Sequence, residues 1–192
     1  MIKGPKQILI ISVIALIIGA MFFSFRGPEG EADITIEAEL DKSTYTSDEP
    51  INLTLHLNNT GELDACISDM AGETLVFNSL TRNGEMVNTR RVDANYLAPL
   101  PMLLEASLED LPVGGDTHVV LSSEHDSGLD ARAFTTTELE GDTGFITFYD
   151  ISEPGEYNLE LVYQYPGPDS ENCENVFFGP SNVQNITFTV SE

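Results

Sequence analysis

Beyond residue 30 the apolar residues of this chain recur at every second position, and this period strongly restricts the possible fold. Ile34, Ile36, Ala38 and Leu40 alternate with polar residues, and the stretch from Ile51 to Leu57 repeats the pattern. A period of two places the apolar side chains on one face of an extended strand, so each stretch predicts a half-buried β-strand. Strands with one apolar face need a second layer of structure to cover that face.

Further stretches with strand character follow, each bounded by clusters of Gly, Pro, Asn or Asp. They are Thr74 to Leu80, Glu85 to Val92, His118 to Ser122, Phe145 to Tyr149, Tyr157 to Tyr165 and Ile186 to Val190. No segment after residue 30 sustains a helical apolar stripe for three turns, although Leu103 to Leu111 could supply one short helical turn. The pattern predicts an all-β domain over residues 32–192, an immunoglobulin-like β-sandwich of about seven to nine strands.

An uncharged apolar run, Ile8 to Phe25, precedes this domain. As a helix it would measure about 27 Å, enough to cross a bilayer once. The run exceeds the apolar region of a signal peptide, about 7 to 15 residues, and bulky aromatic residues follow Ala20 where signal peptidase prefers small ones. The sequence therefore favours a retained transmembrane signal anchor over a cleaved signal peptide.

The charges around the apolar run predict its orientation. Lys3 and Lys6 outweigh Arg26, so the positive-inside rule places residues 1–7 in the cytoplasm. Residues 26–31 contain Gly, Pro and charges and predict a short tether. We expect a single-pass protein of the cell membrane, bound through residues 8–25, with its C-terminal domain outside the cytoplasm.

The predicted domain is strongly acidic. All 32 Asp and Glu residues follow Arg26, together with only five cations, which are Lys42, Arg82, Arg90, Arg91 and Arg132. Such a surface repels phosphate backbones, which excludes nucleic-acid binding. The charge favours a solvated surface suited to salty surroundings, and a cation-binding surface is the alternative.

The chain contains two cysteines, Cys66 and Cys173. Outside the cytoplasm they are expected to form a disulfide, whereas two free thiols would imply a cytosolic domain. The bond would stabilise the domain by about 4 to 5 kcal/mol in the chain-entropy model. It would also fasten the long loop from Pro166 to Asn182 onto the sandwich.

Two stretches resemble known extracytoplasmic immunoglobulin-like modules. Tyr45 to Gly61 contains a Tyr, an Asp48-Glu49-Pro50 turn, an alternating strand and Asn59-Thr60-Gly61; Pro154-Gly155-Glu156-Tyr157 then precedes a second alternating strand. Both are similar to the BsuPI-type proteinase-inhibitor family first known from Bacillus and to related cell-adhesion-type modules. Asp48 replaces the usual Gly, and the family's Trp-containing middle segment has no counterpart here. The resemblance implies a fold rather than a chemistry.

The residues that catalysis requires do not form a recognisable motif. The chain has three histidines, His56, His118 and His125, but no G-x-S-x-G, C-x-x-C, Gly-rich phosphate loop or H-E-x-x-H. No His or Met follows Cys173, as a copper site of cupredoxin type would need. We therefore expect no enzyme and no cofactor.

Two weaker signals concern calcium and glycosylation. End loops of sandwich domains often hold calcium through carboxylates, and the candidates are Glu124, Asp126, Asp130, Glu140 and Asp142. None of them has EF-hand spacing. Among three Asn-x-Thr sequons, only Asn58 falls at a predicted turn rather than within a predicted strand.

The leading hypothesis is a binding or assembly module that acts by protein–protein contact, with a partner in the envelope or a second copy of itself. The alternative is a protease-inhibitor-like module that uses an exposed loop, Asn95 to Met102; the candidate contact residues are Leu97, Pro99, Leu100 and Pro101. A second alternative is an envelope enzyme with an unrecognised site.

Overall fold

The structure, a computed structural model, describes residues 31–93, 99–140 and 143–192. Residues Ala32–Glu192 form a compact unit of their own. No helix within the described residues is long and apolar enough to cross a membrane. The predicted anchor over residues 8–25 and its flanking segments lie outside the described residues, so their assignment remains a prediction.

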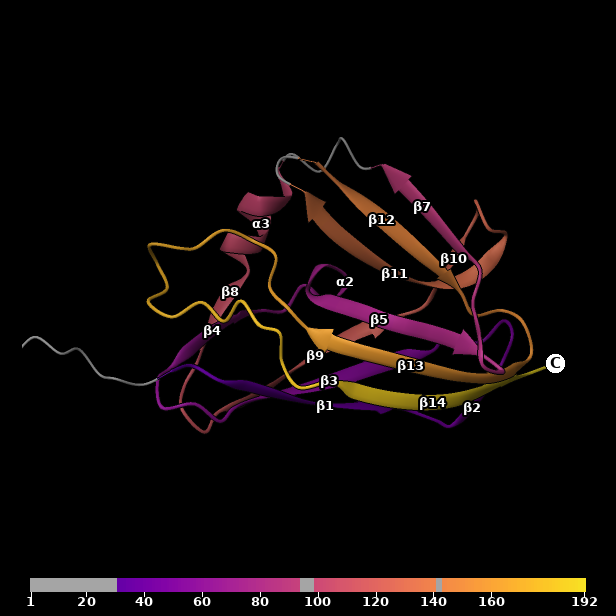
Figure 1. Cartoon of the computed structure of the whole chain (residues 1–192), viewed down its shortest axis with the longest axis horizontal. Helices are drawn as coiled ribbons and strands as arrows, with labels where there is room; N and C mark the ends of the chain where they lie inside the picture. The colour runs from indigo at the N-terminus through magenta and orange to yellow at the C-terminus, as the bar shows by residue number, and fades with distance from the viewer. Residues whose placement is uncertain (1–30, 94–98, 141–142) are drawn as a thin grey trace, which may run out of the picture. The chain divides into compact units, whose positions relative to one another are not determined.

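The described part is predominantly β-strand, as the alternating pattern predicts (Figure 1). A three-stranded antiparallel sheet has the order β1-β3-β9, with β1 at Ile34–Leu40, β3 at Asn52–Asn59 and β9 at Asp116–Ser122. A five-stranded sheet has the order β2-β14-β13-β5-β6; its strands are β2 (Thr44–Thr46), β14 (Gln184–Ser191), β13 (Gly155–Tyr163), β5 (Leu75–Arg82) and β6 (Glu85–Met86).

A four-stranded sheet, a two-stranded sheet and two short helices complete the described elements. The order β10-β11-β12-β7 joins β10 (Glu124–Asp126), β11 (Ala131–Glu140), β12 (Thr143–Asp150) and β7 (Thr89–Asp93). The pair β4-β8 consists of Ala65–Ser68 and Leu108–Leu111, and the helices are α2 (Ala71–Thr74) and α3 (Leu100–Ala106).

The period of two determines which side chains form the core. Leu53, Leu55 and Leu57 of β3 are fully buried, whereas the residues between them are only partly covered. Because β3 is the central strand of its sheet, its backbone groups pair on both sides. Alternation thus assigns one face of this sheet to the core and the other to solvent.

Contacts between aromatic rings connect three strands of the five-stranded sheet. Tyr157 of β13 stacks on Phe188 of β14, with ring centroids 4.9 Å apart and planes 2° from parallel. Tyr45 of β2 meets the same Phe188 edge-on at 6.2 Å. All three side chains are at most 1% exposed, so this cluster is a central part of the core.

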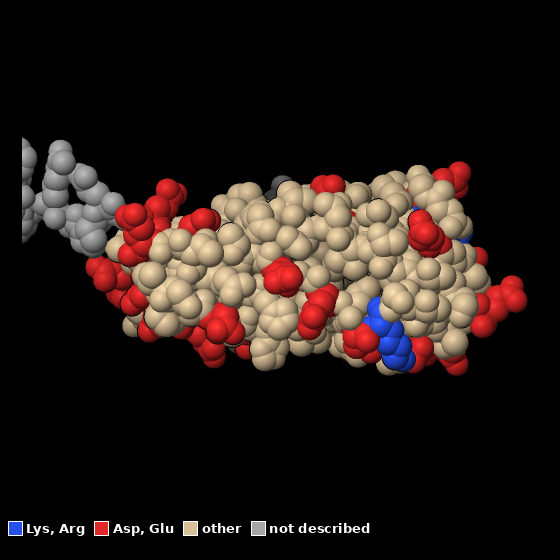
Figure 2. Space-filling model, turned by 90° about the horizontal axis from the view of Figure 1, so that it is seen from below, with Lys and Arg blue, Asp and Glu red and all other residues tan. Residues whose placement is uncertain are grey.

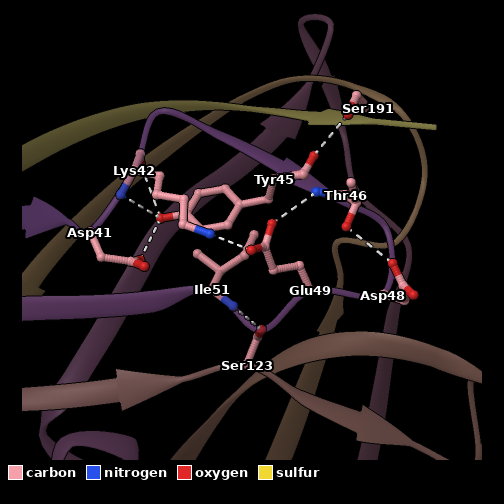
Figure 3. A network of polar contacts seen from close by, with 9 residues as sticks. All are labelled: Asp41, Lys42, Tyr45, Thr46, Asp48, Glu49, Ile51, Ser123 and Ser191. Carbon is pink, nitrogen blue, oxygen red and sulfur yellow. Dashed lines mark hydrogen bonds and ion pairs between the residues drawn. The ribbon is translucent and has the colours of Figure 1, made fainter.

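A network of polar contacts fixes the crossing from β1 to β2 (Figure 3). The Tyr45 hydroxyl donates to Asp41 at 2.8 Å and accepts the Lys42 backbone N–H at 3.1 Å. Lys42 in turn pairs with Glu49, whose carboxylate also accepts the backbone N–H of Thr46. The Ser191 hydroxyl of β14 donates to the Tyr45 carbonyl at 3.2 Å and joins this segment to the end of β14.

The side chain of Asn182 occupies part of the outer edge of β1. Its amide oxygen accepts the N–H of Ile36 at 2.6 Å, and its amide nitrogen donates to the carbonyl of Ile36 at 3.0 Å. The amide therefore takes the place of a neighbouring strand and satisfies backbone groups that an edge strand leaves open.

The structure corrects one predicted strand and adds several others. The stretch Glu85 to Val92 is not one strand, because it divides into β6 and β7, which belong to different sheets. The strands β2, β4, β8, β10 and β11 were not predicted. In β11 the run Thr135-Thr136-Thr137 contains no apolar side chain, and this removes the alternating signal.

Candidate functional site

A disulfide joins Cys66 of β4 to Cys173, as the sequence predicts, with 6.3 Å between the Cα atoms. Backbone bonds support it on both sides of Cys66: its N–H donates to Asn175 at 2.9 Å, and its carbonyl accepts the N–H of Phe177 at 3.0 Å. The long loop after β13 therefore runs beside β4 like a further strand. This loop is fixed by a covalent bond and by backbone pairing together.

The helix α3 lies on the core through one face and leaves two large apolar side chains outside. Leu100 and Leu104, one helical turn apart, are 4% and 0% exposed, whereas Met102 and Leu103 are 72% and 53% exposed. Pro101 stands in the first turn, where its missing N–H costs nothing.

This arrangement corrects the predicted contact loop. Leu100 is buried in the core and is not available for contact, because the helix turns it inward. Pro101 is only half-exposed within the first helical turn, Pro99 is exposed, and Leu97 lies outside the described residues. Met102, the last residue of the predicted loop, and Leu103, just beyond it, are the exposed apolar residues of this segment, and neither was among the predicted contact residues. The spacing of Leu100 and Leu104 was the signal that could have shown them to face outward.

Hydrogen bonds tie α3 to the disulfide-linked loop. The Ser170 hydroxyl donates to Glu105 of α3 at 3.2 Å, and Ser68 of β4 shares a hydrogen bond of 2.6 Å with Ser107 at the end of the helix. Tyr163 anchors the same region, because its hydroxyl accepts the Ser68 N–H at 2.8 Å and donates to the Ser68 carbonyl at 3.2 Å. Figure 1 shows α3 and the loop at the same end of the domain.

The loop carries a third exposed apolar side chain, Phe178, which is 45% exposed and lies 5.9 Å from the ring of Tyr165. Burial, followed by the charges of Glu105 and Asp169, raises the pKa of Tyr165 to about 12. We call Met102, Leu103 and Phe178 together the contact end. It is a set of exposed apolar groups on a platform that a disulfide and hydrogen bonds hold in place.

The remaining surface is acidic. Figure 2 shows Asp and Glu side chains spread over one face, with basic side chains at few points. Large apolar side chains that remain exposed in such a domain are candidates for contact with another protein.

The predicted calcium ligands do not form a common site in the described residues. Both carboxylate oxygens of Asp126 accept hydrogen bonds from Arg90, and the backbone N–H of Leu129 adds a third at 2.8 Å. Asp130 lies 3.6 Å from His125, Glu124 is exposed, and the side chain of Glu140 and all of Asp142 lie outside the described part. Within the ranges given above, no three His, Cys, Asp or Glu side chains are arranged to hold a metal ion. Calcium binding remains a prediction.

The pair of Arg90 and Asp126 predicts a stability change in acid. The hydrogen bonds from Arg90 lower the pKa of Asp126 below its usual value, against the opposing effect of burial. A depressed pKa stabilises the folded state above the pKa of the unfolded chain, and this stabilisation disappears as the pH falls through the folded value. We expect urea midpoints measured between pH 6 and about pH 2 to fall less in Asp126→Asn than in the wild type. An equal fall in both proteins would contradict the assignment.

Asn58 is not at a turn, which corrects the basis of the predicted glycosylation site. It lies inside β3, paired with Thr35 on one side and Asp116 on the other, and is half-buried. The turn signal at Asn58 failed because β3 continues through Asn59.

The histidines also have defined places. His56 and His118 face each other across β3 and β9, and His125 lies in β10. A polar pocket of about 140 Å³ lies between β5, β6 and β13 and is lined by residues that include Arg82, Glu153 and Tyr157, but no histidine lines it. Arg82 and Glu153 already pair there at 3.1 Å.

Comparison with known proteins does not identify a family. No family model and no curated protein matches the chain. Among solved structures it is similar to a β-glucosidase from Erythrobacter marinus, with a TM-score of 0.38 and 12% identity over 83% of this chain and 16% of that one. It is also similar to AvmM, which catalyses macrocyclization in alchivemycin A biosynthesis, with a TM-score of 0.31 and 13% identity over 83% of this chain and 89% of that one. The chain thus spans about a sixth of the glucosidase's length.

Proposed function

We propose that this chain is a membrane-anchored, extracytoplasmic binding or assembly module of immunoglobulin-like fold that acts by protein–protein contact and without catalysis. The membrane anchor is the apolar run of residues 8–25, and the contact end is the surface that meets the partner. The partner is a protein of the envelope or a second copy of the chain.

Strand order supports the immunoglobulin-like part of this proposal. The order β1-β3-β9 corresponds to strands A, B and E of an immunoglobulin sandwich, and β14-β13-β5 corresponds to G, F and C. Tyr157, at the start of the strand equivalent to F, donates its hydroxyl proton to the carbonyl of Glu153, four residues upstream, at 2.7 Å. This contact has the form of the tyrosine corner of such domains.

The exposure of Met102 is the observation on which the contact function rests. A side chain of this size, 72% exposed beside the exposed Leu103, loses contact with water only when another molecule covers it. The flexible methionine side chain adapts its shape to a partner. A surface that is already held rigid loses less conformational entropy on binding. The end of the predicted inhibitor loop is not an exposed extended segment, because α3 begins at Leu100 and buries its side chain.

The test is a double substitution, Met102→Ser with Leu103→Ser, in full-length protein purified from native membranes in mild detergent. We expect the stoichiometric partner found with the wild type to be reduced about tenfold or more, since each buried apolar side chain contributes about 1.5 to 3 kcal/mol. Quantitative mass spectrometry of the complex measures the ratio, and light scattering detects self-association.

The matched control is Val113→Ser with Val120→Ser, which removes two exposed side chains from β9 and from the turn that precedes it. It should leave the partner ratio unchanged. Retention of the partner by the Met102/Leu103 variant, or equal loss in the control, would refute the contact end as the binding surface.

A further inference from the structure

Two histidines lie directly opposite each other on the solvent side of the three-stranded sheet. His56 of β3 pairs in register with His118 of β9, and the ring centroids are 6.2 Å apart with planes tilted by 40°. Both side chains point outward, because the neighbouring positions Leu55, Leu57 and Val119 belong to the core. The pair belongs neither to the contact end nor to the predicted calcium residues.

The spacing of the rings suits one shared metal ion. With metal–nitrogen bonds of about 2.0 to 2.1 Å and about 1.1 Å from nitrogen to ring centre, two imidazoles on one ion have centroids about 5 to 6.4 Å apart, from a tetrahedral to a linear angle. The observed 6.2 Å lies at the linear end of this range. Rotation of exposed side chains, without movement of the strands, would therefore direct one nitrogen of each ring to a common point.

The adjacent strand supplies carboxylates. Glu39 of β1 places Oε1 3.2 Å from Nε2 of His56, and Glu37 is the direct register partner of His56. Asp116 lies on the same face, two positions from His118. None of the outward positions of β1, β3 and β9 holds Lys or Arg, so this face attracts cations.

We propose that His56 and His118 bind one divalent transition-metal ion of the class that prefers imidazole nitrogen, with the Glu39 carboxylate as the outer hydrogen-bond partner of His56 and water completing the coordination. Cu²⁺ is the strongest binder of such ligands among the first-row divalent ions, followed by Zn²⁺ and Ni²⁺. Two imidazoles in register on adjacent strands, and a carboxylate within hydrogen-bonding distance of one of them, distinguish this pair from isolated surface histidines. The site is independent of the proposed contact function.

The test titrates untagged full-length protein in mild detergent with Cu²⁺, in excess Mg²⁺ so that oxygen ligands elsewhere on the acidic surface are occupied. Calorimetry measures the affinity, and electron paramagnetic resonance counts the nitrogen ligands. We expect one ion per chain with two equatorial nitrogens. His56→Asn and His118→Asn should each weaken binding about tenfold or more and abolish the two-nitrogen signal. Glu39→Gln should weaken binding less and keep both nitrogens.

His125→Asn is the matched control, because His125 is also accessible to solvent but lies on β10 with Asp130 as its neighbour. It should leave affinity and signal unchanged. The proposal is overturned if His125→Asn weakens binding as much as His56→Asn, or if the double variant of His56 and His118 keeps the wild-type affinity. Gln at either position provides a second variant should an Asn variant lose the cooperative thermal unfolding of the wild type.

Discussion

Replacing Phe188 with Ala is expected to lower the free energy of unfolding by about 3 to 5 kcal/mol. The Phe188 ring is 1% exposed and contacts both Tyr157 and Tyr45, so its removal leaves a cavity between strands β2, β13 and β14. It also removes the aromatic pair interactions, which contribute about 0.5 to 1.5 kcal/mol each. Urea unfolding of the full-length protein, followed by circular dichroism, measures the change.

Phe178→Ala makes the same chemical change on the surface and serves as the control. Phe178 is 45% exposed and rests on one side of Tyr165, so its loss should cost no more than about 1 kcal/mol. Equal destabilisation by the two substitutions would show that the Phe188 cluster is not the centre of the core.

Removing the disulfide has the second largest expected effect. The combined change Cys66→Ala and Cys173→Ala should lower the free energy of unfolding by about 2 to 5 kcal/mol, because the bond closes a loop of 107 residues and restricts the unfolded chain. The backbone bonds from Cys66 to Asn175 and Phe177 would persist in the folded variant. Differential scanning calorimetry of wild type and variant, each with and without reductant, measures the contribution of the disulfide to stability.

The reductant is the internal control for this prediction. It should destabilise the wild type to about the level of the double variant and leave the double variant unchanged. A double variant as stable as the oxidised wild type would show that backbone pairing alone holds the loop against β4.

The alternating pattern predicted those strands whose inward faces are uniformly apolar. The stretch from Ile51 to Leu57 became most of β3, because every second residue there is buried. The pattern failed at Thr135 to Thr137, where the run is polar although Thr136 is buried and β11 pairs with β12 throughout it. Edge strands of two to four residues, such as β2, are too short to show any period.

The assignment of strands to sheets and the position of the contact end could be predicted less well from the sequence. The division between Met86 and Thr89 arises because β6 pairs with β5 through the tight turn Asn83-Gly84, whereas β7 pairs with the distant strand β12. The Asn-Gly turn is a local signal for the first pairing, but no local property of the sequence encodes the second. The disulfide followed from composition and compartment alone. The contact end could not be predicted from composition, because the exposure of Met102 depends on which face of the helix Leu100 turns toward the core.

The parallel pairing of β2 with β14 sets the time at which the domain can close. Tyr45 and Ser191, whose backbone and side chain meet at this pairing, lie 146 residues apart. At about 5 to 20 residues per second, a ribosome needs about 7 to 30 s to progress from one to the other. Throughout that interval Tyr45 and the apolar faces of the early strands lack the strand that covers them. A nascent chain of this design therefore depends on protection by chaperones or on its own negative charge until synthesis has passed β14.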